Sequence, residues 1–206
     1  MTVNFAKTLS AISCKLLAIM VLLLCLPQSA SAEKTDWSEP GYSFRGVGTV
    51  VVENISFDTN TREIPTIAIK KLQGELVKGT NKLKCQVLTA EQAKTVGATA
   101  DLIVRTKIKY WHNSFYIIPE HTEWETRTVY RNDDERVSIL VPVTYPPRRV
   151  DVSDIITDFE VYDAKTGKMV FMREDNRSRE DSNAQTNMFG RMANSFFSDL
   201  NKKLKK

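Results

Sequence analysis

The residues of this sequence best placed for chemistry are His121, Glu123 and Glu125, which alternate along one segment. If that segment is a β-strand, all three side chains project from the same face. A histidine and two carboxylates are ligands that metal ions use in proteins. Arg127 continues the same row, however, and its positive charge would repel a cation. We therefore interpret the row as a solvated polar face, with a metal site as the alternative, and we expect no cofactor.

Candidates for catalysis are few. Cys85 is the only cysteine after residue 32, so a disulfide within the later part of the chain is excluded. It lies in the alternating segment 83–88 with no histidine nearby in sequence, which favours a buried and inert thiol. Acidic residues at 151–160 could form a carboxylate pair, but the hairpin register expected below gives two of them arginine partners. We therefore expect that the protein is not an enzyme.

Aromatic residues gather in the segment 115–149 at a density that a solvated loop does not require. Aromatic side chains dominate the hot spots of protein–protein interfaces. The alternative is that these rings belong to the core of the domain. We predict a partner-binding surface formed by Phe115, Tyr116, Trp124, Tyr130 and Tyr145.

Residues 1–32 have the three-part pattern of a secretory signal peptide. Lys7 and Lys15 precede or begin an apolar run of 11 residues, Leu16 to Leu26, and Ala30-Ser31-Ala32 supplies a small-x-small cleavage site. The run is shorter than the roughly 20 apolar residues that a membrane-spanning helix needs. Its cysteines do not sit behind a small residue at the end of the run, so a lipid anchor is not expected. We predict cleavage after Ala32 and a periplasmic or extracellular location.

Composition restricts the partners of the exported chain. Of the 206 residues, 174 follow residue 32, which is a natural size for one domain. The net charge of +4 falls to +2 without Lys7 and Lys15, which argues against nucleic-acid binding. A C-terminal lysine cluster suits the negative end of a helix dipole, and contact with an anionic membrane is the alternative. The cluster comprises Lys202, Lys203, Lys205 and Lys206.

Hydrophobic periodicity predicts the helices that would position these residues. The first is capped at Asn60 or Thr61 and ends at Gly79, with an apolar stripe of Ile64, Ile67, Ala68, Leu72 and Leu76. A short second helix has Thr89 and Gln92 as a capping box and ends at Gly97. Ser182 with Gln185 is expected to cap the last helix, whose stripe is Met188, Phe189, Met192, Phe196, Leu200 and Leu204.

Alternating and β-branched segments predict the strands. Residues 33–44 are polar and are expected to form a flexible leader before a single domain at 45–206. Within that domain the segment 115–149 is expected to be an inserted β-hairpin, with Pro142 on an edge strand. The expected strands cover 47–55, 83–88, 101–111, 121–130, 136–145, 152–162 and 168–178.

The last two strands should form a hairpin around the loop Ala164-Lys165-Thr166-Gly167. A four-residue loop pairs Asp163 with Lys168, which places apolar pairs on one face and opposite charges on the other, as a half-buried sheet requires. The pairs expected from this register are Val161–Val170, Phe159–Met172, Asp158–Arg173 and Asp154–Arg177. The full order of elements predicts an α+β two-layer sandwich, with a mostly antiparallel sheet and helices packed on one face.

This pattern resembles a broad group of exported bacterial envelope proteins. The resemblance is carried by a short helix ending Val96-Gly97-Ala98, a strand beginning Ala100-Asp101-Leu102-Ile103-Val104, the hairpin Tyr162–Lys168 and the amphipathic C-terminal helix. The group includes uncharacterised lipoprotein-like families and the N-terminal α/β modules of curli-assembly and TolB-type proteins. The inserted hairpin and the absence of a lipid-attachment pattern depart from it. The resemblance implies a non-enzymatic binding or assembly module.

The sequence thus supports two classes of function. The first is an envelope module that acts through contacts with another envelope protein. The alternative is an extracytoplasmic protein that binds a small ligand or a metal ion. The oligomeric state is open at this point.

Overall fold

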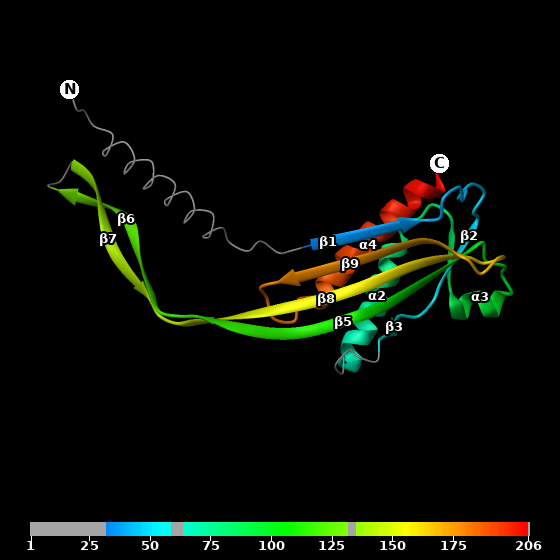
Figure 1. The fold of residues 1–206 in the computed structure, drawn as a ribbon, viewed down its shortest axis with the longest axis horizontal. Coiled ribbons are helices and arrows are strands. Elements are labelled where there is room, and N and C mark those ends of the chain that lie inside the picture. The colour runs from blue at the N-terminus through cyan, green and yellow to red at the C-terminus, as the bar shows by residue number, and fades with distance from the viewer. Residues whose placement is uncertain (1–31, 59–63, 132–134, 206) are drawn as a thin grey trace, which may run out of the picture. The chain divides into compact units, whose positions relative to one another are not determined.

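The computed structural model describes residues 32–58, 64–131 and 135–205 (Figure 1). The predicted signal peptide and the residues of the predicted helix cap, Asn60 and Thr61, lie outside these residues. The first predicted helix begins at Thr66, later than that cap requires, so Ile64 of the predicted stripe precedes the helix. The helices are α2 (Thr66–Thr80), α3 (Ala90–Val96) and α4 (Gln185–Leu204). The strands are β1 (Ala32–Ser38), β2 (Thr49–Val52), β3 (Ser56–Phe57), β4 (Gln86–Thr89), β5 (Leu102–Ile118), β6 (His121–Arg131), β7 (Glu135–Tyr145), β8 (Arg148–Asp163) and β9 (Met169–Arg179).

The main sheet is mixed, whereas the sequence predicted a mostly antiparallel one. Its order is β1-β9-β8-β5-β2-β4, with β3 also paired to β5. The pairs β1–β9, β8–β9 and β5–β8 are antiparallel. The pairs β2–β4, β2–β5 and β3–β5 are parallel. The parallel pairs follow from the helical connections, because a strand that returns after a crossover helix runs in the original direction.

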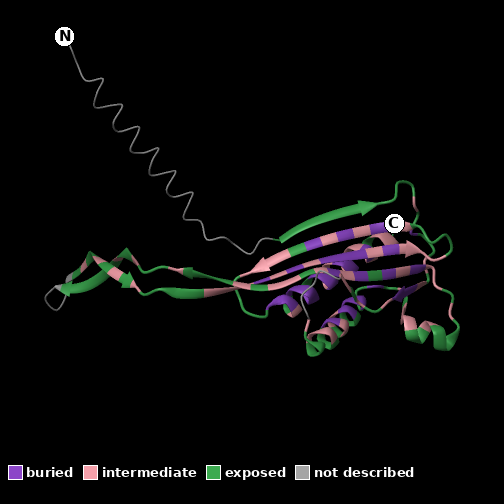
Figure 2. Cartoon of the chain, turned by 60° about the horizontal axis from the view of Figure 1, so that its bottom comes forward, coloured by how far each residue is buried: buried purple, intermediate pink, exposed green. Residues whose placement is uncertain are grey.

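The core lies where α4 packs on β8 and β9 and α2 packs against α4. Figure 2 shows that buried residues are concentrated in these elements. The predicted stripe of α4 is buried from Met188 to Leu200, and Leu204 packs half-buried at its end. In α2, Leu72 and Leu76 are buried, but Ile67 is 68% exposed. Ile67 lies in the first turn, where it borders a cleft instead of the core.

The capping box of α3 is present as predicted. The Thr89 hydroxyl accepts a hydrogen bond from the Gln92 amide at 3.2 Å, and the Gln92 side chain accepts one from the Thr89 amide at 2.9 Å. Gly97 ends the helix at a φ of 60°, in the left-handed region that glycine adopts without strain.

The predicted cap of α4 is wrong. Gln185 is the first residue of that helix, and no side chain within the described residues caps its N-terminus in the usual way. The Gln185 side chain instead donates to the carbonyl of His112 at 2.9 Å and to Oδ1 of Asn113 at 2.6 Å. The Ser153 hydroxyl accepts from the Ala184 amide at 3.1 Å. The start of α4 is therefore anchored on β5 and β8, which sequence spacing does not reveal.

The register of the β8–β9 hairpin differs from the prediction by one residue. The loop is correct, because the Asp163 amide donates to the Lys168 carbonyl at 2.9 Å. A β-bulge follows at once, so the strand pairs slip. Our four predicted pairs are wrong: the structure pairs Val161 with Phe171, Phe159 with Arg173, Asp158 with Glu174 and Asp154 with Ser178.

Asp158 consequently has a different ionic partner. Lys109 lies 3.5 Å from Asp158 and also forms an ion pair with Glu174, on the side of the sheet that α4 does not cover. Burial raises the pKa of the Asp158 carboxyl above its ordinary value. The predicted partnership of Asp158 with Arg173 is therefore wrong, and Lys109 is the cation beside Asp158.

Candidate protein-interaction surface

An arm leaves the main sheet where the β5–β8 ladder ends. We define the arm as residues 115–131 and 135–149. The β5–β8 ladder runs to the pair Ile118–Arg148. Beyond Pro119 on one side and Pro146-Pro147 on the other, a second ladder runs from His121–Tyr145 to Arg131–Glu135. Among the described residues, β6 and β7 pair only with each other. The ribbon therefore has no third strand in the described part of the chain.

Large apolar side chains on the ribbon are exposed. Trp124 is 68% exposed, Tyr130 67% and Leu140 65%, and their positions in the ladder place all three on one face. Val129 and Ile139 are exposed on the opposite face. Figure 2 shows the arm as almost wholly exposed or half-buried. The core alternative for these rings therefore does not describe Trp124 or Tyr130.

The other predicted aromatic residues lie elsewhere on the arm. Phe115 and Tyr116 are exposed at its base, on opposite faces of β5. The Arg149 guanidinium lies 4.1 Å from the Phe115 ring centroid, and the Tyr116 hydroxyl donates to Glu180 at 2.9 Å. That hydrogen bond raises the pKa of Tyr116. The five predicted residues thus do not form one continuous patch.

The row that suggested a metal site lies on the face of β6 opposite Trp124. The rings of His121 and Tyr145 stack with centroids 5.4 Å apart, and His121 Nε2 lies 3.4 Å from Glu123. Glu125 accepts a hydrogen bond from the Tyr145 hydroxyl and lies 3.4 Å from Arg127. The described residues contain no group of three or more histidine, cysteine or acidic side chains that could hold a metal ion.

Hydrogen bonds and charges link the side chains of this row to one another. The hydrogen bond from Tyr145, with a smaller contribution from Arg127, lowers the pKa of the Glu125 carboxyl below its ordinary value. The same hydrogen bond raises the pKa of Tyr145, because it favours the protonated hydroxyl. Glu125 is therefore a carboxylate at neutral pH, with Arg127 beside it in the same row.

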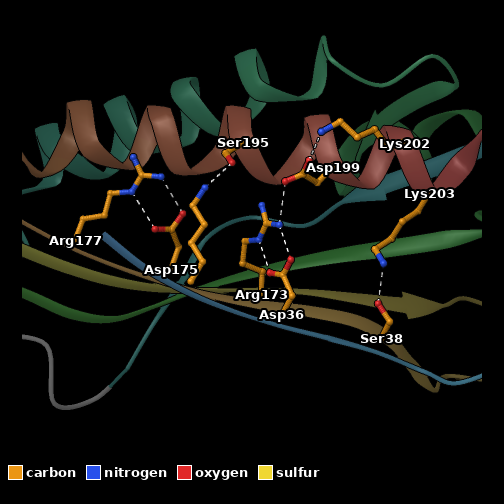
Figure 3. Close-up of polar contacts among 10 residues, drawn as sticks. Asp36, Ser38, Arg173, Asp175, Arg177, Ser195, Asp199, Lys202 and Lys203 are labelled. Carbon is orange, nitrogen blue, oxygen red and sulfur yellow. Dashed lines mark hydrogen bonds and ion pairs between the residues drawn. The ribbon is translucent and has the colours of Figure 1, made fainter. Parts of the chain in front are cut away.

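Strand β1 forms one edge of the main sheet and occupies the first part of the segment that was expected to be a flexible leader. Its backbone pairs with β9 from Ala32–Arg177 to Ser38–Phe171. Arg173 donates to both carboxylate oxygens of Asp36, at 2.6 and 2.7 Å, and to Asp199 of α4 at 3.0 Å (Figure 3). The hydrogen bonds that Arg173 donates to Asp36 are the main cause of its raised pKa. Polar composition predicted a loose segment, but these polar groups have partners.

Two further contacts hold β1 against α4. Lys34 donates to the Ser195 hydroxyl at 2.9 Å. Lys203 donates to the Ser38 hydroxyl at 2.8 Å (Figure 3). Lys203 also lies 4.7 Å from the ring centroid of Phe171. The contacting residues of β1 alternate with the others along the strand, and this period of two was the signal that sequence reasoning missed. Lys203, predicted as part of a C-terminal cluster, thus contacts β1.

A buried ion pair lies beside this contact on β9. Arg177 donates to both carboxylate oxygens of Asp175, at 2.9 and 3.0 Å, as Figure 3 shows. The Asp175 side chain is 0% exposed, and that of Arg177 is 15% exposed. The predicted partner of Arg177 was Asp154, and the bulge in the hairpin explains the difference.

A cleft of about 440 Å³ lies between the first turns of α2 and α4 and strand β5. Its size falls within the range of small-ligand sites. The Gln185 side chain in its wall is buried, and its oxygen has no hydrogen-bond partner among the described residues. Trp111, His112, Lys71 and Thr186 are among the other residues that line it.

Comparison with known proteins shows distant likenesses only. No protein-family model matches the chain, and no curated protein matches it in sequence. Among solved structures it is similar to a PelC dodecamer from Paraburkholderia phytofirmans, with 14% identity and a TM-score of 0.49 over 83% of this chain and 98% of that chain. It is also similar to lipoprotein GNA1162 from Neisseria meningitidis, with 10% identity and a TM-score of 0.39 over 75% and 99% of the two chains.

A third similar structure is protein XCC0632 from Xanthomonas campestris, with 11% identity and a TM-score of 0.40 over 79% of this chain and 86% of that chain. These likenesses are at low identity, and they assign neither a family nor an activity to this chain. No helix among the described residues is long and apolar enough to cross a membrane.

Proposed function

We propose that the chain is an exported, non-enzymatic module of the bacterial cell envelope that binds another protein through its arm. The observation that supports this proposal is the set of exposed apolar side chains on both faces of the β6–β7 ribbon. An isolated two-stranded hairpin is at best marginally stable in water, and three strands or a covering layer are needed for stability. A ribbon with this composition is suited to a partner that covers it.

The backbone of the arm supports the same function. β6 and β7 each have one edge that no described strand occupies, so their outward N–H and C=O groups are free to accept a further strand. Prolines at 119, 142, 146 and 147 restrict the conformation of the arm, which lowers the entropy lost on binding. Strand addition and the burial of Trp124 and Tyr130 would act together.

Replacement of residues 119–147 by a short Gly-Ser turn tests this function. The β5–β8 ladder ends at Ile118–Arg148, so the turn closes an existing pair and the main sheet is retained. We expect the trimmed protein to fold and to lose its protein partners in a pull-down from its own cell envelope. A trimmed protein that folds and retains those partners would contradict the proposal.

Point variants refine this test within the folded arm. The double variant Trp124→Ser, Tyr130→Ser should reduce partner recovery, because exposed aromatic side chains are the usual anchors of interfaces. The matched control is Thr126→Ser, Thr128→Ser, which alters the same exposed face without removing a ring. Equal recovery by the two double variants would show that the rings are not the contact.

A second candidate function is small-ligand binding in the cleft beside α4. The buried Gln185 oxygen without a partner favours it, because a ligand donor group could satisfy that atom. A ligand that binds only the folded state raises the melting temperature, and the gain in stability grows with the logarithm of ligand concentration once the concentration exceeds the dissociation constant. Thermal melts of the protein with pooled envelope metabolites should then show a shift that Thr186→Ala and Lys71→Ala reduce.

The exported location also has a direct test. We expect protein recovered from outside the cytoplasm to begin at Glu33, because the small-x-small site ends at Ala32. Intact-mass measurement of that protein gives the answer, and a mass that still includes residues 1–32 would show that the segment is retained.

A further inference from the structure

The free edge of β6 differs from that of β7 in its ability to accept a strand. β7 contains Pro142, which has no N–H to donate, and it is followed by Pro146 and Pro147. β6 has 11 residues and no proline. Its edge therefore offers a complete set of backbone groups to a partner strand, and it is the edge of the arm better suited to pairing.

The charges along β6 have the pattern of a strand that complements itself. Glu125 and Arg127 are partly exposed neighbours on one face, on either side of Thr126. If β6 meets β6 of a second copy antiparallel about a two-fold axis at Thr126, each Glu125 lies opposite Arg127 of the other copy. A shift of one residue pair in either direction would place Glu125 opposite Glu125 or Arg127 opposite Arg127. The shifted registers also bring Glu123 opposite Arg127 or Arg131, but each has a like-charge pair at its centre. The register about Thr126 has opposite charges and no like-charge pair, so it is the one that the charges favour.

The same register covers the aromatic face. It places Trp124 of one copy opposite Thr128 of the other and diagonal to the other copy's Tyr130, within reach of long side chains. The ribbon would become a four-stranded sheet in the order β7-β6-β6-β7, which is more than the three strands that independent stability requires. Charge, backbone and aromatic side chains agree on one geometry.

We infer that the arm binds a second copy of this chain, by antiparallel pairing of β6 with β6 about Thr126. This inference rests on the proposed function, since it names the partner of the arm. It makes the interface isologous, so that each contact occurs twice. The exported protein should therefore be a dimer whose two copies meet through their arms.

Charge exchange tests the register. Glu125→Arg and Arg127→Glu each place two like-charge pairs in the interface, so each variant alone should self-associate about tenfold or more weakly than the parent. An equimolar mixture restores opposite charges at both positions and should recover the dimer in sedimentation velocity. Glu91→Arg on α3 is the control for Glu125→Arg, because it makes the same change in net charge at an exposed site. It should leave association unchanged.

Cross-linking tests the axis independently. Thr126→Cys places the two new thiols opposite each other and should give a covalent dimer under mild oxidation. Thr128→Cys, which faces Trp124 in this register, should not. A parent protein that is monomeric at high concentration, a mixture that fails to re-associate, or equal cross-linking of the two cysteine variants would overturn the inference.

The outcomes separate this inference from the proposed function. If the charge variants do not change the mass of the assembly in solution, but the protein with the trimmed arm no longer captures other envelope proteins, self-pairing is wrong and the proposed function stands. If the mixture recovers a dimer while the trimmed protein still captures its envelope partners, the arm serves self-association and those partners bind elsewhere.

Discussion

Phe196→Ala should lower the free energy of unfolding by ~3–5 kcal/mol, the usual range for removal of a buried phenylalanine side chain. Phe196 is 0% exposed and stacks on Phe159 and Phe171, with ring centroids 4.7 and 5.8 Å apart, so it joins α4 to both β8 and β9. Its ring also meets Phe197 edge to face. The loss combines the transfer free energy of the ring, a cavity and these aromatic contacts.

Denaturant melts of the folded protein measure this loss. Arg191→Ala is the matched control, because Arg191 is exposed on the same helix and the substitution removes no core contact. The control should change stability by less than about 0.5 kcal/mol, as exposed substitutions usually do. A change below about 1 kcal/mol for Phe196→Ala would mean that α4 does not pack on the sheet.

Arg177→Met should be comparably destabilising, by about 3–5 kcal/mol, because it leaves a charged group buried without its partner. Asp175 is 0% exposed, and Arg177 donates to both of its carboxylate oxygens. Methionine retains much of the arginine stem and its packing, so the expected loss reports mainly on the missing guanidinium.

The double variant Asp175→Asn, Arg177→Met distinguishes this explanation from lost packing. It removes the buried charge as well as its partner, so it should recover a large part of the stability lost in Arg177→Met. Urea melts of the single and double variants form the required comparison. If the double variant is as unstable as Arg177→Met, the Asp175 charge is not the cause.

The elements that the sequence predicted well are those set by local chemistry. The capping box at Thr89 and Gln92 and the loop between Asp163 and Lys168 each need only a few neighbouring residues, and both are present. The apolar stripe of α4 repeats over many residues, so its buried face was also predictable. The sheet was predicted as mostly antiparallel, because periodicity reports strands and not their direction.

The predictions that were wrong depended on long-range partners. The β-bulge near Val161 moves every later pair of the hairpin by one residue, and an alternating sequence has no mark for it. Asp36 finds Arg173 across 137 positions of sequence, so a segment that reads as polar and loose forms an ordered strand. Gln185 was assigned to a cap, but its partners His112 and Asn113 lie on a distant strand.

The exposure of the aromatic residues was predictable in part. Aromatic composition located the arm, and the structure shows Trp124 and Tyr130 exposed on a ribbon face. Composition could not show that Phe115 and Tyr116 lie on opposite faces of β5, or that Tyr145 lies on the ribbon face opposite Trp124, because the face depends on strand register. The charge pattern of Glu125 and Arg127 was visible in the sequence, but its proposed role in pairing depends on the free edge of β6, which only the structure shows.

The continuity of the arm with β5 and β8 also determines how the domain would respond to force. A pull on the arm along these strands would draw β5 and β8 in the same direction, past β9 and β2. The β8–β9 ladder from Ser153–Arg179 to Tyr162–Met169 would then be loaded in shear, with its hydrogen bonds resisting together instead of opening one after another. Tension that reaches the arm is thus transmitted to the main sheet through the full length of this ladder.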